Sequence, residues 1–309
     1  MTESKIYDLI IIGTGPAGLT ASIYASRYKL EHLLFGAESG GQMNEIHNIE
    51  NWPGELSVSG YDLISRLVAH VENYGVKIQK DSIGSIQKNE DGTFEIKTSR
   101  GVYLAKSLIL AMGAHYRRMN IPGEKEFIGR GVSYCATCDA MFFRDKTVAV
   151  IGGGNSAVVV ALELVDFAAH IYLVTQEEKL SAEPAWVEKI MQNSKIEVIR
   201  GTSVLEIKGE EKVEKIILDQ PHDDKTYLAV DGVFIEVGTE PGVELSQKIG
   251  VELDTQNYIK VKEDMSTNVS SVFAAGDITT GSNKFRQVLT AAAEGSIAAN
   301  GVYKLLKLK

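Results

Sequence analysis

The sequence predicts an α/β protein with two Rossmann-like, three-layer nucleotide-binding domains, the second inserted into a discontinuous first. Three observations predict this architecture: two strand–turn–helix units rich in glycine, and a late apolar strand that ends in Gly-Asp. The expected first domain comprises residues 1–115 and 245–309, and the expected inserted domain comprises residues 116–244.

The first unit begins with an apolar, β-branched strand over residues 7–12, and an alanine-rich helical stretch follows its turn. The turn between them is Gly13-Thr-Gly15-Pro16-Ala17-Gly18. Glycines at this spacing let the backbone turn sharply and approach a pyrophosphate, which then lies at the helix N-terminus. The hexapeptide alone is weak evidence, but the strand before it and the helix after it favour a dinucleotide site over a merely tight turn.

The second unit repeats this pattern after a short strand over residues 146–151. Its turn is Gly152-Gly-Gly154-Asn-Ser-Ala157. An acidic residue recurs at the same spacing, because Glu38 lies 25 residues after Gly13 and Glu177 lies 25 residues after Gly152. An acid there is placed to bond a ribose hydroxyl. The chain can therefore hold two nucleotides, unless the second unit is a scaffold whose site no longer works.

The segment 271–277 reads as a strand ending in Gly276-Asp277 and completes the first domain. It lies beyond the second unit, which makes the first domain discontinuous. The turn-forming stretches 115–118 and 238–242 are the expected hinges.

The composition limits which classes of protein the chain can belong to. The chain has 309 residues, 44% of them hydrophobic, and a formal net charge of −9. That charge argues against a nucleic-acid partner and against attraction to an anionic membrane surface. The N-terminus does not resemble a signal peptide, and glycines interrupt the longest uncharged run, so we expect a cytoplasmic protein with no membrane span.

Cys135 and Cys138 are the only cysteines, and Asp139 follows them directly. Zinc would need further ligands, and the six histidines show no ligand spacing, so the sequence predicts no metal site. A structural disulfide would close a loop too small to constrain the unfolded chain. In a reducing compartment, a Cys-x-x-Cys pair favours redox chemistry over two inert thiols.

Together these motifs resemble the low-molecular-weight bacterial thioredoxin reductases. The resemblance spans nearly the whole chain, and it rests on 13–18, 40–42, 50–54, 111–114, 135–139, 273–277, 286–287 and 291–295. It implies a homodimer, FAD in the discontinuous domain, and a redox disulfide in the inserted domain that reduces thioredoxin. It also implies a rotation between the domains. Cys138 would lie nearest the flavin, and Cys135 would attack thioredoxin. Asp139 would act as acid or base, with a plain helix cap as the alternative.

The resemblance also implies which residues bind FAD. Asp277 would accept a hydrogen bond from a ribityl hydroxyl, and Gln287 would lie close to the ring. The full set is Gly13, Gly15, Pro16, Ala17, Gly18, Glu38, Gly41, Gln42, Asn51, Gly113, Gly276, Asp277, Arg286 and Gln287.

The second nucleotide site departs from that family. The family's His-Arg-Arg-x-x-x-Arg, which grips the 2′-phosphate of NADPH, is replaced by residues 175–181, and Glu177 takes one arginine position. Residues 158–160 are three valines where the family carries two glutamates, either for packing or because the nicotinamide channel is closed. The remaining Gly152, Gly154 and Ala157 keep the fold of a degenerate pyridine-nucleotide site.

Three electron donors remain open. We expect reduced ferredoxin, narrowly, ahead of NADH and of residual NADPH use, because the arginines and the acidic helix positions are altered together. An acidic ferredoxin would need a basic patch, for which 117–118 and 284–286 are the candidates. A flavin redox sensor without turnover is the alternative of a different class, and the complete set of Cys135, Cys138 and Asp139 counts against it. The sequence therefore predicts an FAD-dependent thioredoxin-disulfide reductase.

Overall fold

The computed structural model describes residues 5–37, 39–46 and 49–308. The chain divides into two compact units: one comprises the residues up to His115 and from Glu240 onward, and the other comprises Tyr116–Thr239. The inserted unit ends earlier than the expected residue 244, because Val243 packs into the core of the first unit.

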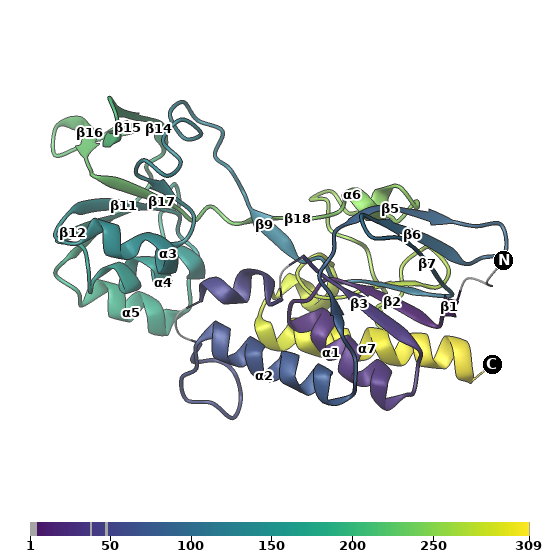
Figure 1. Ribbon diagram of the computed structural model, residues 1–309. Helices are drawn as coiled ribbons and strands as arrows, with labels where there is room; N and C mark the ends of the chain where they lie inside the picture. Colours follow the sequence, from purple (N-terminus) through teal and green to yellow (C-terminus); the bar gives the residue numbers. More distant parts are fainter. Residues whose placement is uncertain (1–4, 38, 47–48, 309) are drawn as a thin grey trace. The chain divides into compact units, whose positions relative to one another are not determined.

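The first unit contains two sheets and three longer helices (Figure 1). Its parallel sheet has the order β19-β8-β2-β3-β4, and its second sheet has the order β1-β7-β6-β5. The elements are β1 (Ile6–Tyr7), β2 (Leu9–Ile12), α1 (Pro16–Arg27), β3 (His32–Phe35), η1 (Gly41–Glu45), α2 (Gly60–Asn73), β4 (Ile78–Gln79), β5 (Ile83–Lys88), β6 (Phe94–Thr98), β7 (Val102–Ala105), β8 (Leu108–Leu110), α6 (Glu244–Gln247), β19 (Val272–Ala274), η3 (Gly281–Lys284) and α7 (Val288–Lys307).

Alternation along β2 explains the layers of this unit. Leu9 and Ile11 pack with α1, α2 and α7, whereas Ile10 and Ile12 pack with the second sheet. Successive side chains of a strand point to opposite faces, so a strand buried on both faces is apolar throughout. Full burial of each such side chain stabilises the fold by about 1.5–3 kcal/mol.

The inserted unit repeats the plan with a three-stranded antiparallel sheet as its outer layer. Its parallel sheet has the order β10-β17-β11-β12-β13, and the outer sheet has the order β14-β15-β16. The elements are β10 (Val132–Ser133), α3 (Ala136–Asp139), η2 (Ala140–Phe143), β11 (Thr147–Ile151), α4 (Asn155–Leu164), β12 (His170–Val174), α5 (Pro184–Met191), β13 (Ile196–Ile199), β14 (Val204–Gly209), β15 (Val213–His222), β16 (Lys225–Ala229) and β17 (Gly232–Ile235).

In the inserted unit, β11 is buried on both faces, as β2 is in the first unit. Val148 and Val150 pack with the helices, and Ala149 and Ile151 pack with the antiparallel sheet. Numbered along the unit, the strands of the first parallel sheet lie in the doubly wound order 3-2-1-4-5. In the inserted unit the order β13-β12-β11-β17 repeats β4-β3-β2-β8, whereas the edge that β19 occupies in the first unit is taken by β10, which comes first along the inserted unit. The fold class predicted from the sequence is confirmed.

The two crossings between the units differ from the sequence prediction. Turn-forming hinges were expected at 115–118 and 238–242, but these segments contain the short strands β9 (Ala114–Tyr116) and β18 (Thr239–Pro241), which pair with each other. Pairing satisfies backbone groups that isolated loops would leave to water. Positive φ values at Gly113 and Gly238 confine the turns to the strand ends.

Candidate redox and nucleotide sites

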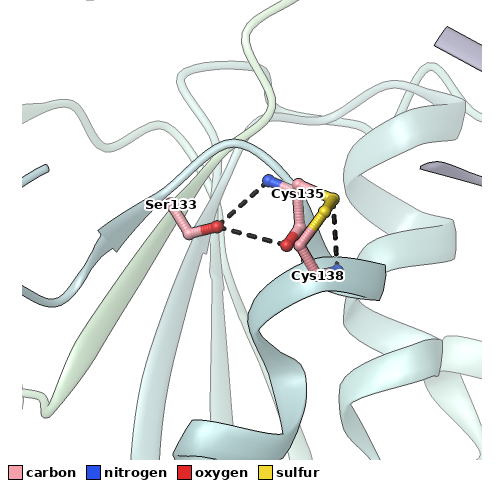
Figure 2. The surroundings of a disulfide bond; sticks show 3 residues. All are labelled: Ser133, Cys135 and Cys138. Carbon is pink, nitrogen blue, oxygen red and sulfur yellow. Dashed lines mark hydrogen bonds between the residues drawn. A yellow bond between two sulfur atoms is a disulfide. The ribbon is translucent and has the colours of Figure 1, made fainter. Parts of the chain in front are cut away.

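The two cysteines lie at the start of a short helix in the inserted unit. Ser133 ends β10, Cys135 is the N-cap of α3, and Cys138 lies within its single turn. The two sulfur atoms form a disulfide, with the Cα atoms 5.3 Å apart (Figure 2). The structure therefore brings the predicted Cys-x-x-Cys pair together in its oxidised form.

Hydrogen bonds hold this segment in place. The Cys135 N–H donates to Ser133 Oγ at 3.0 Å, and the Ser133 hydroxyl donates to the Cys135 carbonyl at 3.2 Å (Figure 2). The Cys138 N–H points to Cys135 Sγ at 3.1 Å. A backbone N–H aimed at that sulfur favours its thiolate once the disulfide opens.

The disulfide is accessible from outside the unit. Cys138 is exposed and Cys135 is half-buried. Met141 and Phe142 follow on η2, and each has 65% of its surface exposed. Large apolar side chains at this exposure are typical of a surface that meets another protein.

Asp139 is half-buried at the end of α3, where its N–H donates to the Cys135 carbonyl at 3.2 Å. It is the N-cap residue of η2, but its carboxylate makes no capping hydrogen bond there. The interpretation of Asp139 as a plain helix cap is therefore wrong. Its role as acid or base stays a prediction.

Glu124 anchors the segment before the cysteines, and sequence reasoning missed it. This buried carboxylate accepts hydrogen bonds from the Tyr134 hydroxyl and from the N–H groups of Met119, at 2.9 Å, and Asn120, at 2.6 Å. Burial, followed by the bond to Glu124, raises the pKa of Tyr134. An acid directly after Pro-Gly carries no sequence signal of this role.

The second glycine-rich turn joins β11 to α4. Gly152 has φ 143°, and a Cβ added there would lie 2.2 Å from the Glu236 carbonyl oxygen, so only glycine fits. A Cβ added at Gly153 would lie 3.4 Å from Glu177 Oε2. The Glu177 carboxylate thus lies against the turn, as the sequence spacing predicts.

The loop after β12 bonds to the same turn. The Ser181 N–H donates to the Gly153 carbonyl at 2.8 Å. Asn155 and Glu183 exchange two bonds: the Asn155 amide donates to Glu183 Oε1 at 3.2 Å, and the Glu183 N–H donates to Asn155 Oδ1 at 2.7 Å. Contacts within the chain therefore hold this loop in place.

The valines of α4 have unequal surroundings. Val158 is fully buried beside Ala157, whereas Val159 and Val160 are half-buried. The packing interpretation thus fits Val158. One turn later, burial raises the pKa of Glu163 to about 7.

The first glycine-rich turn joins β2 to α1. Gly13 has φ 115°, and a Cβ added there would lie 2.0 Å from the Ala111 carbonyl oxygen. At Gly15, the N-cap of α1, the nearest atom to an added Cβ is 4.0 Å away, and Pro16 follows within the first turn of the helix. The N-terminus of α1 therefore begins in open space, where its N–H groups can meet an anion.

Buried donors without partners lie in this same unit. In the described part of the chain, Gln42 Nε2 and both Nε and Nη2 of Arg286 are buried and make no hydrogen bond. The Arg286 guanidinium lies 3.9 Å from the centroid of the Tyr258 ring. Because an unmet buried donor is costly, such groups point to a bound ligand rich in acceptors, as FAD is.

Two acidic groups of this unit, Asp277 and Glu294, lie beside the end of the Gly-Asp strand, and Glu294 is buried. Burial raises the pKa of Asp277 to about 6, while the charge of Arg286 lowers it and that of Glu294 raises it. Glu294, which sequence reasoning did not single out, accepts from the Gly276 N–H at 2.8 Å and from the Thr279 hydroxyl at 3.0 Å. Glu294 thus holds the end of the Gly-Asp strand in place.

The remaining predicted FAD residues have different surroundings. The Asn51 amide donates to Gln287 Oε1 at 2.9 Å, so two residues far apart in the sequence meet. Gly41 and Gly113 have positive φ and nothing within 4 Å of an added Cβ. Glu38 lies outside the described residues.

The chain matches known proteins over nearly its whole length. The family described as pyridine nucleotide-disulphide oxidoreductase matches residues 7–295. The chain is 38% identical over 307 residues to a thioredoxin reductase of Bacillus subtilis, covering 98% of this chain and 95% of that protein.

Two solved structures are also similar. A thioredoxin reductase of Lactococcus lactis has a TM-score of 0.92 and 36% identity, covering 96% of this chain and 98% of that one. A ferredoxin-flavin thioredoxin reductase of Clostridium acetobutylicum has a TM-score of 0.53 and 31% identity, covering 98% and 99%. Among the described residues, no helix is long and apolar enough to cross a membrane.

Proposed function

Because the chain belongs to the pyridine nucleotide-disulphide oxidoreductase family, we propose that it reduces the disulfide of thioredoxin or of a thioredoxin-like protein, with NADH as the electron donor. The chain is a flavoprotein oxidoreductase, and its cofactor is FAD. The accessible Cys135–Cys138 disulfide is the observation that carries the proposal.

The cysteines would act by thiol–disulfide exchange. The Cys135 thiolate attacks one sulfur of the substrate disulfide, whose other sulfur leaves as a thiolate and takes up a proton. The Cys138 thiolate then attacks Cys135 Sγ, which closes the Cys135–Cys138 disulfide and releases the second substrate thiol. Two electrons pass to the substrate, and Asp139 carries the proton between the thiols and water. The exposed Met141 and Phe142 would contact the protein substrate.

The first glycine-rich turn and the N-terminus of α1 would hold the pyrophosphate of FAD. Gln42 and Arg286 supply buried donors, and Asp277 would accept from a ribityl hydroxyl. When bound, FAD supplies two-electron transfer between the donor and the disulfide.

NADH as donor rests on Glu177. Its carboxylate lies against Gly153, at the position where an acid bonds the ribose hydroxyls of NAD, and it would repel the 2′-phosphate of NADPH. The similarity to curated thioredoxin reductases supports a pyridine nucleotide at least as well as the ferredoxin that the sequence favoured.

The ferredoxin alternative has less support at one of its two expected docking stretches, residues 284–286. Lys284 pairs with Asp254 at 2.6 Å, and part of the Arg286 guanidinium is buried. These two cations therefore do not form an unpaired basic surface. The expected homodimer and cytoplasmic location stay predictions.

Anaerobic reduction of the FAD-loaded protein tests the donor. NADH, NADPH and chemically reduced ferredoxin are added separately while the absorbance of the oxidised flavin is followed. We expect rapid bleaching with NADH and much slower bleaching with NADPH. Bleaching by ferredoxin alone would overturn NADH as donor and leave the inserted unit as a carrier of the cysteines.

Turnover with thioredoxin tests the disulfide separately. We expect Cys135→Ser to bleach with the donor as the wild type does, yet to leave thioredoxin oxidised. Wild-type turnover by this variant would refute the dithiol mechanism.

A further inference from the structure

Two histidines and a glutamate from three strands of the inserted unit converge on its surface. The Nε2 atom of His222 lies 2.7 Å from Glu197 Oε1, and the Nε2 atom of His170 lies 3.2 Å from Glu197 Oε2. His170 begins β12, Glu197 lies on β13 and His222 ends β15. Both imidazoles thus approach the two oxygens of one carboxylate.

Asp223 offers a further ligand atom beside this cluster. Its Oδ2 lies 4.0 Å from His222 Nε2, and the ligand atoms of Glu197, His222 and Asp223 all lie within 4.8 Å of one another. Asp223 and Asp224 have positive φ and form the two-residue turn between β15 and β16. The Asp223 side chain is 89% exposed and can swing toward the cluster.

An aromatic ring orients both imidazoles. The Tyr172 ring makes edge contacts with His170, at 4.5 Å between centroids, and with His222, at 6.4 Å. The rings are therefore held with their Nε2 atoms directed at the carboxylate.

We propose that Glu197, His222 and Asp223 bind one divalent transition-metal ion of the zinc class. An imidazole and carboxylate oxygens form a donor set that suits Zn²⁺. Neighbouring ligand atoms of a tetrahedral zinc site lie about 3.3 Å apart, because each lies about 2.0–2.1 Å from the metal. The ligand atoms of these three residues already lie within 4.8 Å of one another. His170 contacts the other Glu197 oxygen at 3.2 Å and so positions this carboxylate without binding the ion itself.

The ion would join the edge of the parallel sheet to the outer antiparallel sheet. In the strand order β10-β17-β11-β12-β13, the edge strand β13 is at the opposite end from β10, which leads to the cysteines. The site is therefore separate from the redox chemistry, and its role is to stabilise the inserted unit.

Metal binding by the untagged, FAD-loaded protein tests this proposal. The disulfide is kept oxidised so that no thiol competes for the ion. Calorimetric titration with Zn²⁺ should give one ion per chain, and His222→Ala should weaken binding at least about 100-fold, whereas His170→Ala, which removes a residue that only positions Glu197, should weaken it about 10–100-fold. The control His70→Ala removes an exposed histidine on α2 and should bind as the wild type does.

A second measurement uses the wild type alone, so that it does not depend on the folding of a variant. Crystals equilibrated with Zn²⁺ should show an anomalous peak within about 2.0–2.2 Å of the His222 Nε2 atom and of one oxygen each of Glu197 and Asp223. Unchanged affinity in a well-folded His222→Ala variant, or a peak elsewhere, would overturn the proposal and leave the cluster as a hydrogen-bonded link between strands.

Discussion

The two glycine-rich units share the order of four parallel strands but differ in what surrounds their turns. In the first unit, the described donors of Gln42 and Arg286 are buried without partners. In the second, Ser181 bonds the turn directly, and Glu183 bonds Asn155 at the start of α4. An unmet buried donor favours a ligand that stays bound, whereas a turn satisfied by its own chain suits a ligand that comes and goes. The same local motif thus lies in two different settings, which fits a resident cofactor in one unit and the proposed exchange of NADH in the other.

The largest expected effect comes from a substitution that disrupts the first glycine-rich turn. Gly13→Ala places a Cβ against the Ala111 carbonyl in a left-handed conformation, and we expect a loss of about 3 kcal/mol or more in the free energy of unfolding, together with loss of FAD. Gly15→Ala is the matched control for stability alone, because an added Cβ there has open space. Urea unfolding distinguishes the two variants, and the flavin content of Gly13→Ala measures its loss of FAD. Equal stability of both would contradict the role assigned to Gly13.

A smaller effect concerns the unpartnered donors. Arg286→Met should weaken FAD binding about 10–100-fold, because a hydrogen bond to a charged group contributes about 1.5–3 kcal/mol. Titration of the apoprotein with FAD measures this change. Lys284→Met, which removes a cation paired with Asp254, should bind FAD as the wild type does. Similar losses in both variants would indicate a general effect of charge.

At the second turn, Glu177→Ala should raise the KM for NADH about 10-fold with kcat little changed, because it removes binding that is uniform between ground and transition states. Glu177→Arg should improve the use of NADPH. Glu178→Ala is the control, because that carboxylate lies beside Gly201 instead. Steady-state kinetics with both nucleotides measures the changes. A Glu177→Ala variant with unaltered KM would place the nucleotide elsewhere.

The smallest effect is the pH dependence contributed by Glu163 on α4. Its pKa is about 7 in the folded protein against a reference value of 4.5, so the folded state holds a proton that the unfolded state loses between these values. Its contribution to stability is therefore complete below about pH 4.5 and is lost as the pH rises toward 7.

Glu163→Gln should abolish that contribution, about 1 kcal/mol once partial exposure is considered. The difference in unfolding free energy between wild type and variant, measured at pH 5 and pH 7.5, tests it. The exposed Glu188→Gln is the control. A difference that is independent of pH would contradict the shifted pKa.

Much of the fold could be predicted because it depends on neighbours along the chain. The apolar strand over residues 7–12, the two turns and the Cys135–Cys138 pair are local patterns. The hinges were predicted less well. Their extended conformation arises from pairing between segments that are distant in the sequence.

The sequence by itself determined the two nucleotide-binding units, the insertion of one into the other and the redox pair. Each can be recognised from short stretches of sequence and from the order of those stretches along the chain. Only the tertiary structure decided that Glu124 bonds Tyr134 and that His170, Glu197 and His222 meet. Such meetings depend on strand order and on the packing of one sheet against another, and neither is encoded within any single stretch of the chain.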